Sequence, residues 1–282
     1  MKDLVKCNYT LLDCGNFEKL EQVGEVIIRR PALQAAWKRK LGNDIWQQYH
    51  AKFDQVQDKW IILSVENLPY FECDNLTFEL KFSPNQQIGI FPEQFTNWQW
   101  LRDVIFQAYR PLNILNGFAY TGASTLFAST KGTTLTHIDA SSSSVNWAKQ
   151  NCRLSNLENN NIRWIIDDII SFLSREVRRG SVYDGIILDP PAFGHGKKGT
   201  TWKINRDLPK LMKLVDKLLS NDPEFIILSC HDKNFGHLEL RNELTKLHNL
   251  KKGKIETFDL TIKSESGNNL PAGKCVRWKK LN

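Results

Sequence analysis

Aspartate residues close three successive apolar runs of the sequence, and they are the first candidates for binding or catalysis. They are Asp139 at the end of TLTHID, Asp167 and Asp168 after IRWII, and Asp189 after YDGIIL. In an open α/β sheet, ligands bind beyond the carboxyl ends of the strands, where the strand order reverses. A carboxylate there can accept hydrogen bonds from ribose hydroxyls or an adenine amino group. Each acid alone would more commonly be a helix N-cap, but the three together favour a nucleoside site.

The segment LNILNGFAYTGAS, which precedes these runs, carries Gly117 and Gly122 around a tight turn. Small residues let the backbone approach a ligand closely. The phosphate-binding fingerprint G-x-G-x-x-G is absent. This absence speaks against NAD, although an NAD enzyme would also place an acid near the position of Asp139. The turn therefore favours a cofactor without phosphates, such as S-adenosylmethionine.

The most specific stretch is ILDPPAFGHGKKG, in which Asp189 is followed by Pro190 and Pro191. Two consecutive prolines hold the backbone extended where the strand stops, so that the carboxylate and nearby carbonyl groups point toward a methyl donor. Phe193 offers a flat face on which a flipped or single-stranded base can stack. Basic residues follow at once, as phosphate contacts would: Lys197, Lys198, Lys203 and Arg206. We therefore predict that this loop is catalytic and binds nucleic acid.

The order of apolar runs predicts the elements that hold these side chains. We expect strands at 112–117, 134–138, 162–166, 183–188 and 224–229, and helices at about 123–130, 142–155, 168–178, 203–219 and 236–248. Alternating strands and helices indicate a parallel sheet covered on both faces. Residues 254–262 and 274–279 are two strands with no helix between them, which predicts an antiparallel hairpin. The fold class is therefore α/β, with a Rossmann-like sheet closed by a C-terminal hairpin.

The N-terminal part differs in character, and we predict a small, mainly β domain over residues 1–93. Its β-like runs lie at 9–13, 25–29, 60–65 and 78–82, with a helical stretch around residues 35–40. From Phe95, FTNWQWLRDVIFQAYR places apolar side chains on one helical face. This helix leads into a large domain that we predict over residues 94–282.

Composition and charge limit the classes of function. The 282 residues are 41% hydrophobic, and residues 101–282 hold 27 basic and 18 acidic side chains, a net charge of +9. Such a basic half suits a polyanion, because lysine and arginine near phosphates release counterions. No apolar run reaches the roughly eighteen residues of a membrane span, and the first residues lack the apolar core of a secretory signal. We expect a cytoplasmic protein that does not enter a membrane.

Neither the cysteines nor the histidines have the spacing of metal ligands. The six cysteines form no C-x-x-C motif, and we expect reduced thiols. His231 and His237 lie near Asp232, but histidines in loops are more commonly solvated than bound to metal. We therefore predict no metal site.

Together the motifs LNILNGFAYTGAS, THIDAS, WIIDDIISFLSREVRRG and YDGIILDPPAFGHGKKG, with LPAG before the last strand, resemble those of bacterial class I S-adenosylmethionine-dependent methyltransferases. This family is related to the 23S ribosomal RNA large-subunit methyltransferases, including those that make 5-methylcytosine. LLDCGNFEKLEQVGEVIIRRP and GIFPEQFTNWQW also look like the family, so the similarity covers nearly the whole chain. Related RNA methyltransferases often carry an N-terminal RNA-binding module. We expect this chain to lack it, so that RNA would bind to the catalytic domain and the small β domain.

The resemblance implies S-adenosylmethionine as cofactor, RNA as substrate and roles for individual residues. The loop around the methionine moiety would contain Phe118, Tyr120, Thr121 and Gly122. The ribose and adenine would be held by Asp139 and Ala140, and the adenine amino group by Asp168. The reacting centre would be lined by Asp189, Pro190 and Pro191. A segment that covers the cofactor from the N-terminal side would contain Phe91, Glu93 and Gln94.

The atom that receives the methyl group depends on Cys230. Methylation of a cytosine carbon needs a thiolate that adds to the neighbouring ring position, and Cys230, at the end of EFIILSC, is the candidate nucleophile. A buried structural cysteine is the other interpretation. An exocyclic amine or ring nitrogen would need no covalent step, only hydrogen bonds from the Asp-Pro-Pro loop that orient its lone pair. Both routes stay open at the level of sequence.

Two other functions are compatible with the same fold. A methyltransferase acting on a protein or a small molecule would share it, because function resides in the site. So would a binding protein derived from a methyltransferase that has lost its activity. The intact Asp-Pro-Pro motif, Asp139, Phe193 and the basic residues favour an RNA methyltransferase.

Overall fold

The computed structural model describes residues 6–195, 201–232, 235–250 and 252–281. Lys197 and Lys198, which we expect to contact phosphates, lie outside these residues. The chain divides into two compact units. The N-terminal unit contains the residues up to Phe95 together with Leu260–Ala272, and the larger unit contains Thr96–Asp259 and the residues from Gly273 onward.

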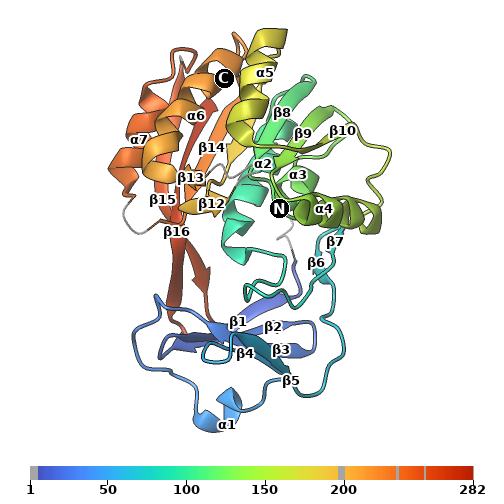
Figure 1. Cartoon of the computed structure of the whole chain (residues 1–282), viewed down its shortest axis with the longest axis vertical. Coiled ribbons are helices and arrows are strands. Elements are labelled where there is room, and N and C mark those ends of the chain that lie inside the picture. The colour runs from blue at the N-terminus through green and yellow to red at the C-terminus, as the bar shows by residue number, and fades with distance from the viewer. Residues whose placement is uncertain (1–5, 196–200, 233–234, 251, 282) are drawn as a thin grey trace. The chain divides into compact units, whose positions relative to one another are not determined.

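The larger unit is built on a twisted, mostly parallel sheet (Figure 1). Its strands in spatial order are β10 (Ile162–Ile166), β9 (Thr133–Asp139), β8 (Leu112–Gly117), β11 (Gly185–Leu188), β14 (Phe225–Cys230), β16 (Asn269–Lys280) and β15 (Gly253–Lys263). Neighbours from β10 to β14 are parallel, whereas β16 is antiparallel to β14. The predicted α/β fold with an antiparallel C-terminal hairpin is confirmed. The strand order reverses between β8 and β11, which is where such sheets bind ligands.

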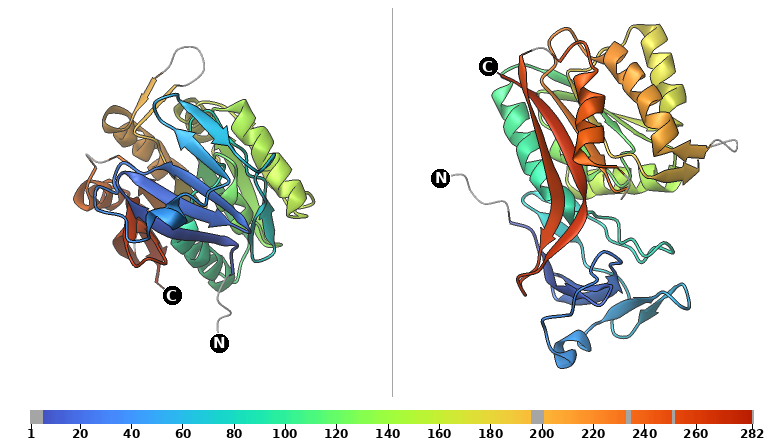
Figure 2. Two further views of the ribbon diagram at one scale, coloured as in Figure 1. Left: turned by 90° about the horizontal axis from the view of Figure 1, so that it is seen from below. Right: turned by 90° about the vertical axis from the view of Figure 1, so that its left-hand side faces the viewer.

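Helices cover both faces of this sheet (Figure 2). On one face lie α5 (Ile169–Arg179), α6 (Ile204–Leu218) and α7 (His237–Thr245), and on the other lies α2 (Phe95–Gln107). The remaining elements are α3 (Ala123–Phe127), α4 (Ser142–Leu154) and the antiparallel pair β12 (Phe193–His195) and β13 (Thr201–Lys203). Every residue of β11 and β14 is buried, as the apolar runs of a strand covered on both faces require. Among the described residues, none of the helices combines the length and the apolar character that crossing a membrane needs.

The N-terminal unit is mainly β, as expected. One sheet has the order β1 (Tyr9–Gly15), β2 (Glu18–Val23), β3 (Val26–Pro31), β4 (Ala51–Asp54) and β5 (Lys59–Ile62), with a parallel pair only between β3 and β4 among these strands. A second pair is β6 (Phe71–Cys73) with β7 (Leu76–Phe78), and the helical turns are α1 (Asn43–Trp46) and η1 (Pro92–Gln94). The domain boundary between residues 93 and 94 stays a prediction.

Two local predictions in this unit are wrong. The stretch around residues 35–40 is not a helix, because its backbone carbonyls are used by the turn between β1 and β2. The carbonyls of Ala35 and Trp37 accept N–H groups of Phe17 and Asn16 at 2.8 and 2.7 Å. The strand predicted at 78–82 is instead β7, which ends at Phe78.

The expectation that all cysteines are reduced thiols is also wrong. Cys7 and Cys73 face each other across an antiparallel bridge, with Cα atoms 4.1 Å apart, and their sulfur atoms form a disulfide. The spacing in the sequence does not reveal this proximity, because 66 residues separate the two. The other four cysteines are free and buried.

The tip of the β15–β16 hairpin belongs to the N-terminal unit. Its Ser266 hydroxyl donates to the buried carboxylate of Asp13 at 2.6 Å, and its Glu265 N–H donates to the carbonyl of Leu11 at 2.9 Å. The flanking side chains of Ile262 and Leu270 pack in the same apolar cluster as Leu11. The core of this unit therefore joins segments that lie 253 residues apart in the sequence.

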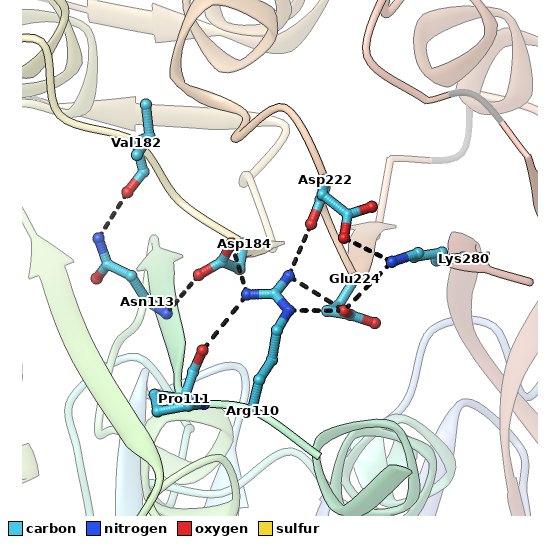
Figure 3. Close-up of polar contacts among 8 residues, drawn as sticks. All are labelled: Arg110, Pro111, Asn113, Val182, Asp184, Asp222, Glu224 and Lys280. Carbon is cyan, nitrogen blue, oxygen red and sulfur yellow. Dashed lines mark hydrogen bonds and ion pairs between the residues drawn. The ribbon is translucent and has the colours of Figure 1, made fainter. Parts of the chain in front are cut away.

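At the amino-terminal ends of the parallel strands, Arg110 ties several loops together (Figure 3). Its guanidinium lies 3.1 Å from carboxylate oxygens of both Asp184 and Glu224, and it donates to the carbonyl of Asp222 at 2.7 Å. The Glu224 side chain is only 8% exposed, so the loss of Arg110 would leave a nearly buried charge without this partner.

We expect Arg110→Ala to lower the free energy of unfolding by about 2 kcal/mol without affecting the residues at the opposite ends of the strands. Urea denaturation measures this change. Arg153→Ala is a matched control, because Arg153 pairs with Glu158 at 3.3 Å but both side chains are more than half exposed. Such a surface pair contributes less than about 0.5 kcal/mol. Equal losses of unfolding free energy in the two variants would show that the contacts of Arg110 stabilise the protein no more than an exposed ion pair does.

Candidate active site

The carboxyl ends of the parallel strands align at one edge of the larger sheet. The register pairs the last residues of neighbouring strands: Ile166 with Asp139, Ile138 with Gly117, and Leu188 with Gly117 and Leu228. The segments that follow therefore leave the sheet beside one another. The structure brings together at this edge the loop after β8, the predicted acids of β9 and β10, the Asp-Pro-Pro motif and Cys230.

The loop after β8 has an unusual backbone. Phe118 and Tyr120 lie in the left-handed region, at φ of 56° and 48°, and Gly122 follows at φ of 89°. Non-glycine residues rarely adopt this conformation, and such strain is concentrated at functional sites. Gly122 is also needed for space, since a β-carbon there would lie 2.9 Å from Cβ of Ala148. The loop is therefore shaped to bring main-chain atoms close to a ligand.

Asp139 fixes this loop. Its Oδ2 accepts the N–H of Tyr120 and its Oδ1 accepts the N–H of Ser141, both at 2.9 Å. Burial raises the pKa of the Asp139 carboxyl, and the two amide hydrogen bonds act in the opposite direction. Each oxygen keeps a second lone pair, as a side chain that binds two ribose hydroxyls requires. Ala140, the next residue, leaves β9 at the same edge.

A buried polar chain lies beneath the loop. Asn116 Nδ2 donates to Thr125 Oγ1 at 2.8 Å, and the Thr125 hydroxyl also forms a hydrogen bond with His137 Nδ1 at 2.9 Å. Burial lowers the pKa of His137 to about 3, with a smaller contribution from Lys149. The imidazole is therefore neutral at physiological pH and connects β8, α3 and β9.

This histidine predicts an acid-dependent loss of stability. Its pKa is about 3 in the folded state against an ordinary 6.5, so the unfolded state binds the proton first as the pH falls through that window. Between pH 7 and 5 the wild type should lose about 2 kcal/mol of unfolding free energy through this group. Urea denaturation at both pH values should show a smaller loss in His137→Gln. The same loss in both proteins would contradict the buried, neutral state.

The two acids after β10 have local roles. Asp168 caps α5, where its Oδ1 accepts the N–H of Ser171 at 2.9 Å. Asp167 accepts the N–H of Asp168 at 2.8 Å and forms an ion pair with Arg175. Both lie at the edge where an adenine would bind, and Asp168 Oδ2 is available beside the cap. Their assignment to the adenine stays a prediction.

The Asp-Pro-Pro loop is held by a residue that sequence analysis missed. Trp202, in β13, donates its indole N–H to the carbonyl of Pro191 at 2.7 Å. Its ring also packs edge-on against Phe118, with centroids 4.9 Å apart. Trp202 therefore connects the loop after β8 with the loop after β11. No pattern in the sequence relates Trp202 to Pro191, because the pairing of β13 with β12 brings the two together.

Phe193 is the first residue of β12, two positions after Pro191, and its side chain is 52% exposed. Lys203 is exposed opposite it in β13. Arg206 contributes less than expected, because its guanidinium donates to Asp207 at 2.6 Å and also to the carbonyl of Thr201. The exposed ring and Lys203 remain suited to a base and a phosphate.

Cys230 ends β14 at this edge, but it is only 1% exposed. Burial raises the pKa of its thiol to about 11, and the nearby carboxylates of Asp232 and Asp189 act in the same direction. The N–H of Asp232 approaches the sulfur at 3.4 Å. Burial therefore outweighs the basic surroundings that would lower the pKa of Cys230 and favour its thiolate.

Other predicted residues belong to the N-terminal unit. Phe91 precedes η1 and Gln94 ends it, Glu93 and Gln94 are buried, and the role of this segment toward the cofactor stays a prediction. His231 and His237 do not share a site, since their imidazoles pair with Asp189 and Asp259. In the described parts of the chain, no three His, Cys, Asp or Glu side chains are grouped as metal ligands.

Comparison with known proteins finds, over most of the chain, the family that the sequence motifs resemble. A family model described as S-adenosylmethionine-dependent methyltransferase matches residues 9–245. The crystal structure of the SAM-dependent methyltransferase from Agrobacterium tumefaciens has a TM-score of 0.91 and 31% identity, covering 97% of this chain and 91% of that one.

Curated relatives are ribosomal RNA methyltransferases. The ribosomal RNA large subunit methyltransferase K/L of Pseudoalteromonas atlantica is 30% identical over 61% of this chain and 23% of its own length. The ribosomal RNA large subunit methyltransferase K of Neisseria meningitidis is 34% identical over 38% of this chain and 31% of its own length. The matched regions thus span less than a third of these relatives.

Proposed function

Because the chain belongs to the S-adenosylmethionine-dependent methyltransferase family, we propose that it methylates a base in RNA, and more narrowly in large-subunit ribosomal RNA. The family establishes the methyl donor and the reaction class. The RNA substrate is supported by the names of the curated relatives and by the basic residues from 101 onward. Since bacterial-type ribosomal RNA is made in the cytoplasm, we propose that compartment.

The residues at the strand ends fit the methyl donor. We propose that the loop of Phe118–Gly122 surrounds its methionine part, that Asp139 accepts hydrogen bonds from its ribose, and that Asp167 and Asp168 lie beside its adenine. The left-handed loop, the lack of room for a side chain at Gly122 and the fixed carboxylate of Asp139 support this assignment. Bound there, S-adenosylmethionine supplies an electrophilic methyl group.

The observation that carries RNA as the substrate is the exposed ring of Phe193 beside the Asp-Pro-Pro motif. A base extruded from its strand loses stacking, and an aromatic side chain replaces it. We propose that the base stacks on Phe193 while Asp189 and the carbonyl groups of the prolines accept hydrogen bonds from it. Trp202 holds Pro191 in place for this contact.

We propose that the acceptor is an exocyclic amine or a ring nitrogen rather than a carbon. A carbon route needs a thiolate at Cys230, but this thiol is buried and its pKa is raised to about 11. At neutral pH almost none of it would be ionised. A nitrogen acceptor needs only the orientation of its lone pair.

Replacement of Cys230 by alanine tests this choice of atom. We expect Cys230→Ala to retain methyltransferase activity within about threefold of the wild type, since nitrogen methylation needs no covalent adduct. Steady-state methyl transfer to RNA measures it. Cys152→Ala, at another buried cysteine on α4, is the matched control for loss of packing. A loss of 100-fold or more in Cys230→Ala alone would favour the carbon route.

The proposed function is tested by incubating the protein with labelled S-adenosylmethionine and either total RNA or isolated ribosomal subunits, followed by nucleoside analysis. We expect one methylated nucleoside, which should be nearly absent when Asp189→Ala replaces the wild type. Label in protein or small molecules with none in any RNA fraction would contradict an RNA substrate and support the other acceptor classes.

A further inference from the structure

Two side chains at the reactive edge form a pair that the proposed function does not yet use. His231 directly follows β14, and its Nε2 lies 3.1 Å from Oδ1 of Asp189 and 3.4 Å from Oδ2. The side chains are 31% and 28% exposed, although the strand residues that precede them are buried. A histidine therefore contacts the carboxylate of the Asp-Pro-Pro motif where a substrate can reach both.

The imidazole ring lies close to β16 at Gly273. A β-carbon on Gly273 would lie 2.9 Å from Nδ1 of His231 and 2.8 Å from the carbonyl oxygen of Cys230. A larger residue would have to displace the ring or the backbone. Glycine at this position thus leaves room for the ring in the orientation that directs Nε2 at Asp189.

We propose that His231 is a positioning residue for methyl transfer. Its Nε2–H donates to the Asp189 carboxylate and holds that group where it accepts a hydrogen bond from an acceptor nitrogen that carries hydrogen. This inference rests on the proposed methylation of nitrogen in RNA. Because His231 already holds the Asp189 carboxylate in place, aligning the acceptor nitrogen costs less conformational entropy in the transition state.

The chemistry is balanced as follows. The acceptor nitrogen forms a bond to the methyl carbon with its lone pair, while the carbon–sulfur bond breaks and its electron pair stays on sulfur. The nitrogen, now positively charged, releases a proton to the Asp189 carboxylate, which passes it to water. A neutral His231 leaves this carboxylate a competent base, whereas a protonated His231 makes it a weaker one.

The pair is therefore expected to make the rate fall at acid pH. Charged groups near this strand end include Asp189, Asp232 and Lys274, which act electrostatically on Cys230, the residue before His231. Loss of the imidazole should remove this dependence, whereas a merely structural role would leave it in place.

The test compares methyl transfer to RNA by the wild type, His231→Ala and His231→Gln at saturating donor. We expect His231→Ala to lower kcat roughly 10- to 100-fold with unchanged affinity for S-adenosylmethionine. Glutamine can keep an N–H near the place of Nε2 without gaining charge. His231→Gln should therefore restore most of the rate at pH 8 and abolish the decline at acid pH.

His248→Ala is the matched control, because this exposed imidazole also pairs with an aspartate, Asp216, at 2.7 Å, and it should keep the wild-type rate. A wild-type kcat in His231→Ala would overturn the positioning role. An unchanged fall of kcat at acid pH in His231→Gln would overturn it too. This second measurement decides whether His231 positions Asp189 even if His231→Ala does not fold. If the wild type labels no RNA, the proposed function fails, and this inference falls with it.

Discussion

Replacement of Asp139 by alanine is expected to weaken S-adenosylmethionine binding about 100-fold while the protein remains folded. The variant would lose the carboxylate that we propose accepts hydrogen bonds from the ribose. The loop would also lose the acceptor that holds the N–H groups of Tyr120 and Ser141. Hydrogen bonds to a charged group contribute more to affinity than those between neutral groups, and the variant would lose both bonds from the ribose hydroxyls. Isothermal titration calorimetry with the donor and with its demethylated product measures the change.

The chain offers a control for the general effect of removing such a carboxylate. Asp216 also accepts a backbone N–H, that of His248, at 2.7 Å, but it lies in α6 away from the strand ends. Asp216→Ala should bind the donor as the wild type does. If Asp139→Ala also binds with wild-type affinity, the assignment of the ribose to Asp139 is wrong.

Replacement of Asp189 by alanine should affect the reaction more than binding of the donor. We expect kcat to fall about 1,000-fold, because the variant loses both the group that orients the acceptor nitrogen and the base that takes its proton. The affinity for S-adenosylmethionine should change much less. Single-turnover methyl transfer to RNA, together with calorimetry, separates the two quantities.

Asp189→Asn refines this test. Asparagine keeps a carbonyl oxygen that can accept a hydrogen bond from the base, but it cannot take the proton. Its rate should therefore lie between those of the wild type and Asp189→Ala. If both variants keep the wild-type kcat, the Asp-Pro-Pro carboxylate takes no part in methyl transfer, and its role is limited to the shape of the loop.

The fold of the larger unit could be predicted because its strands are continuous apolar runs. The run in β14 is buried at every residue, so burial on both faces could be inferred from composition alone. The acids were found because each ends such a run, and parallel strands end at one edge. This reasoning locates residues along a strand but does not show what they contact.

What the sequence did not reveal depends on contacts between distant segments. Trp202 contacts Pro191 because β13 pairs with β12, and His231 contacts Asp189 although 42 residues separate them. The error at residues 35–40 has the same origin, because their carbonyl groups bond to a turn far earlier in the chain. In the same way, the disulfide of Cys7 and Cys73 follows from the pairing of two segments with no shared motif.

The hairpin tip sets an order of events during synthesis of the protein. A ribosome makes Asp13, in β1, 253 residues before Ser266 at the hairpin tip, yet both residues belong to one compact unit. Until Ile262 and Leu270 emerge, the apolar side chain of Leu11 lacks part of its cover. The nascent N-terminal segment therefore stays partly uncovered until the hairpin has been translated, and during this interval its exposed apolar side chains are most prone to aggregation.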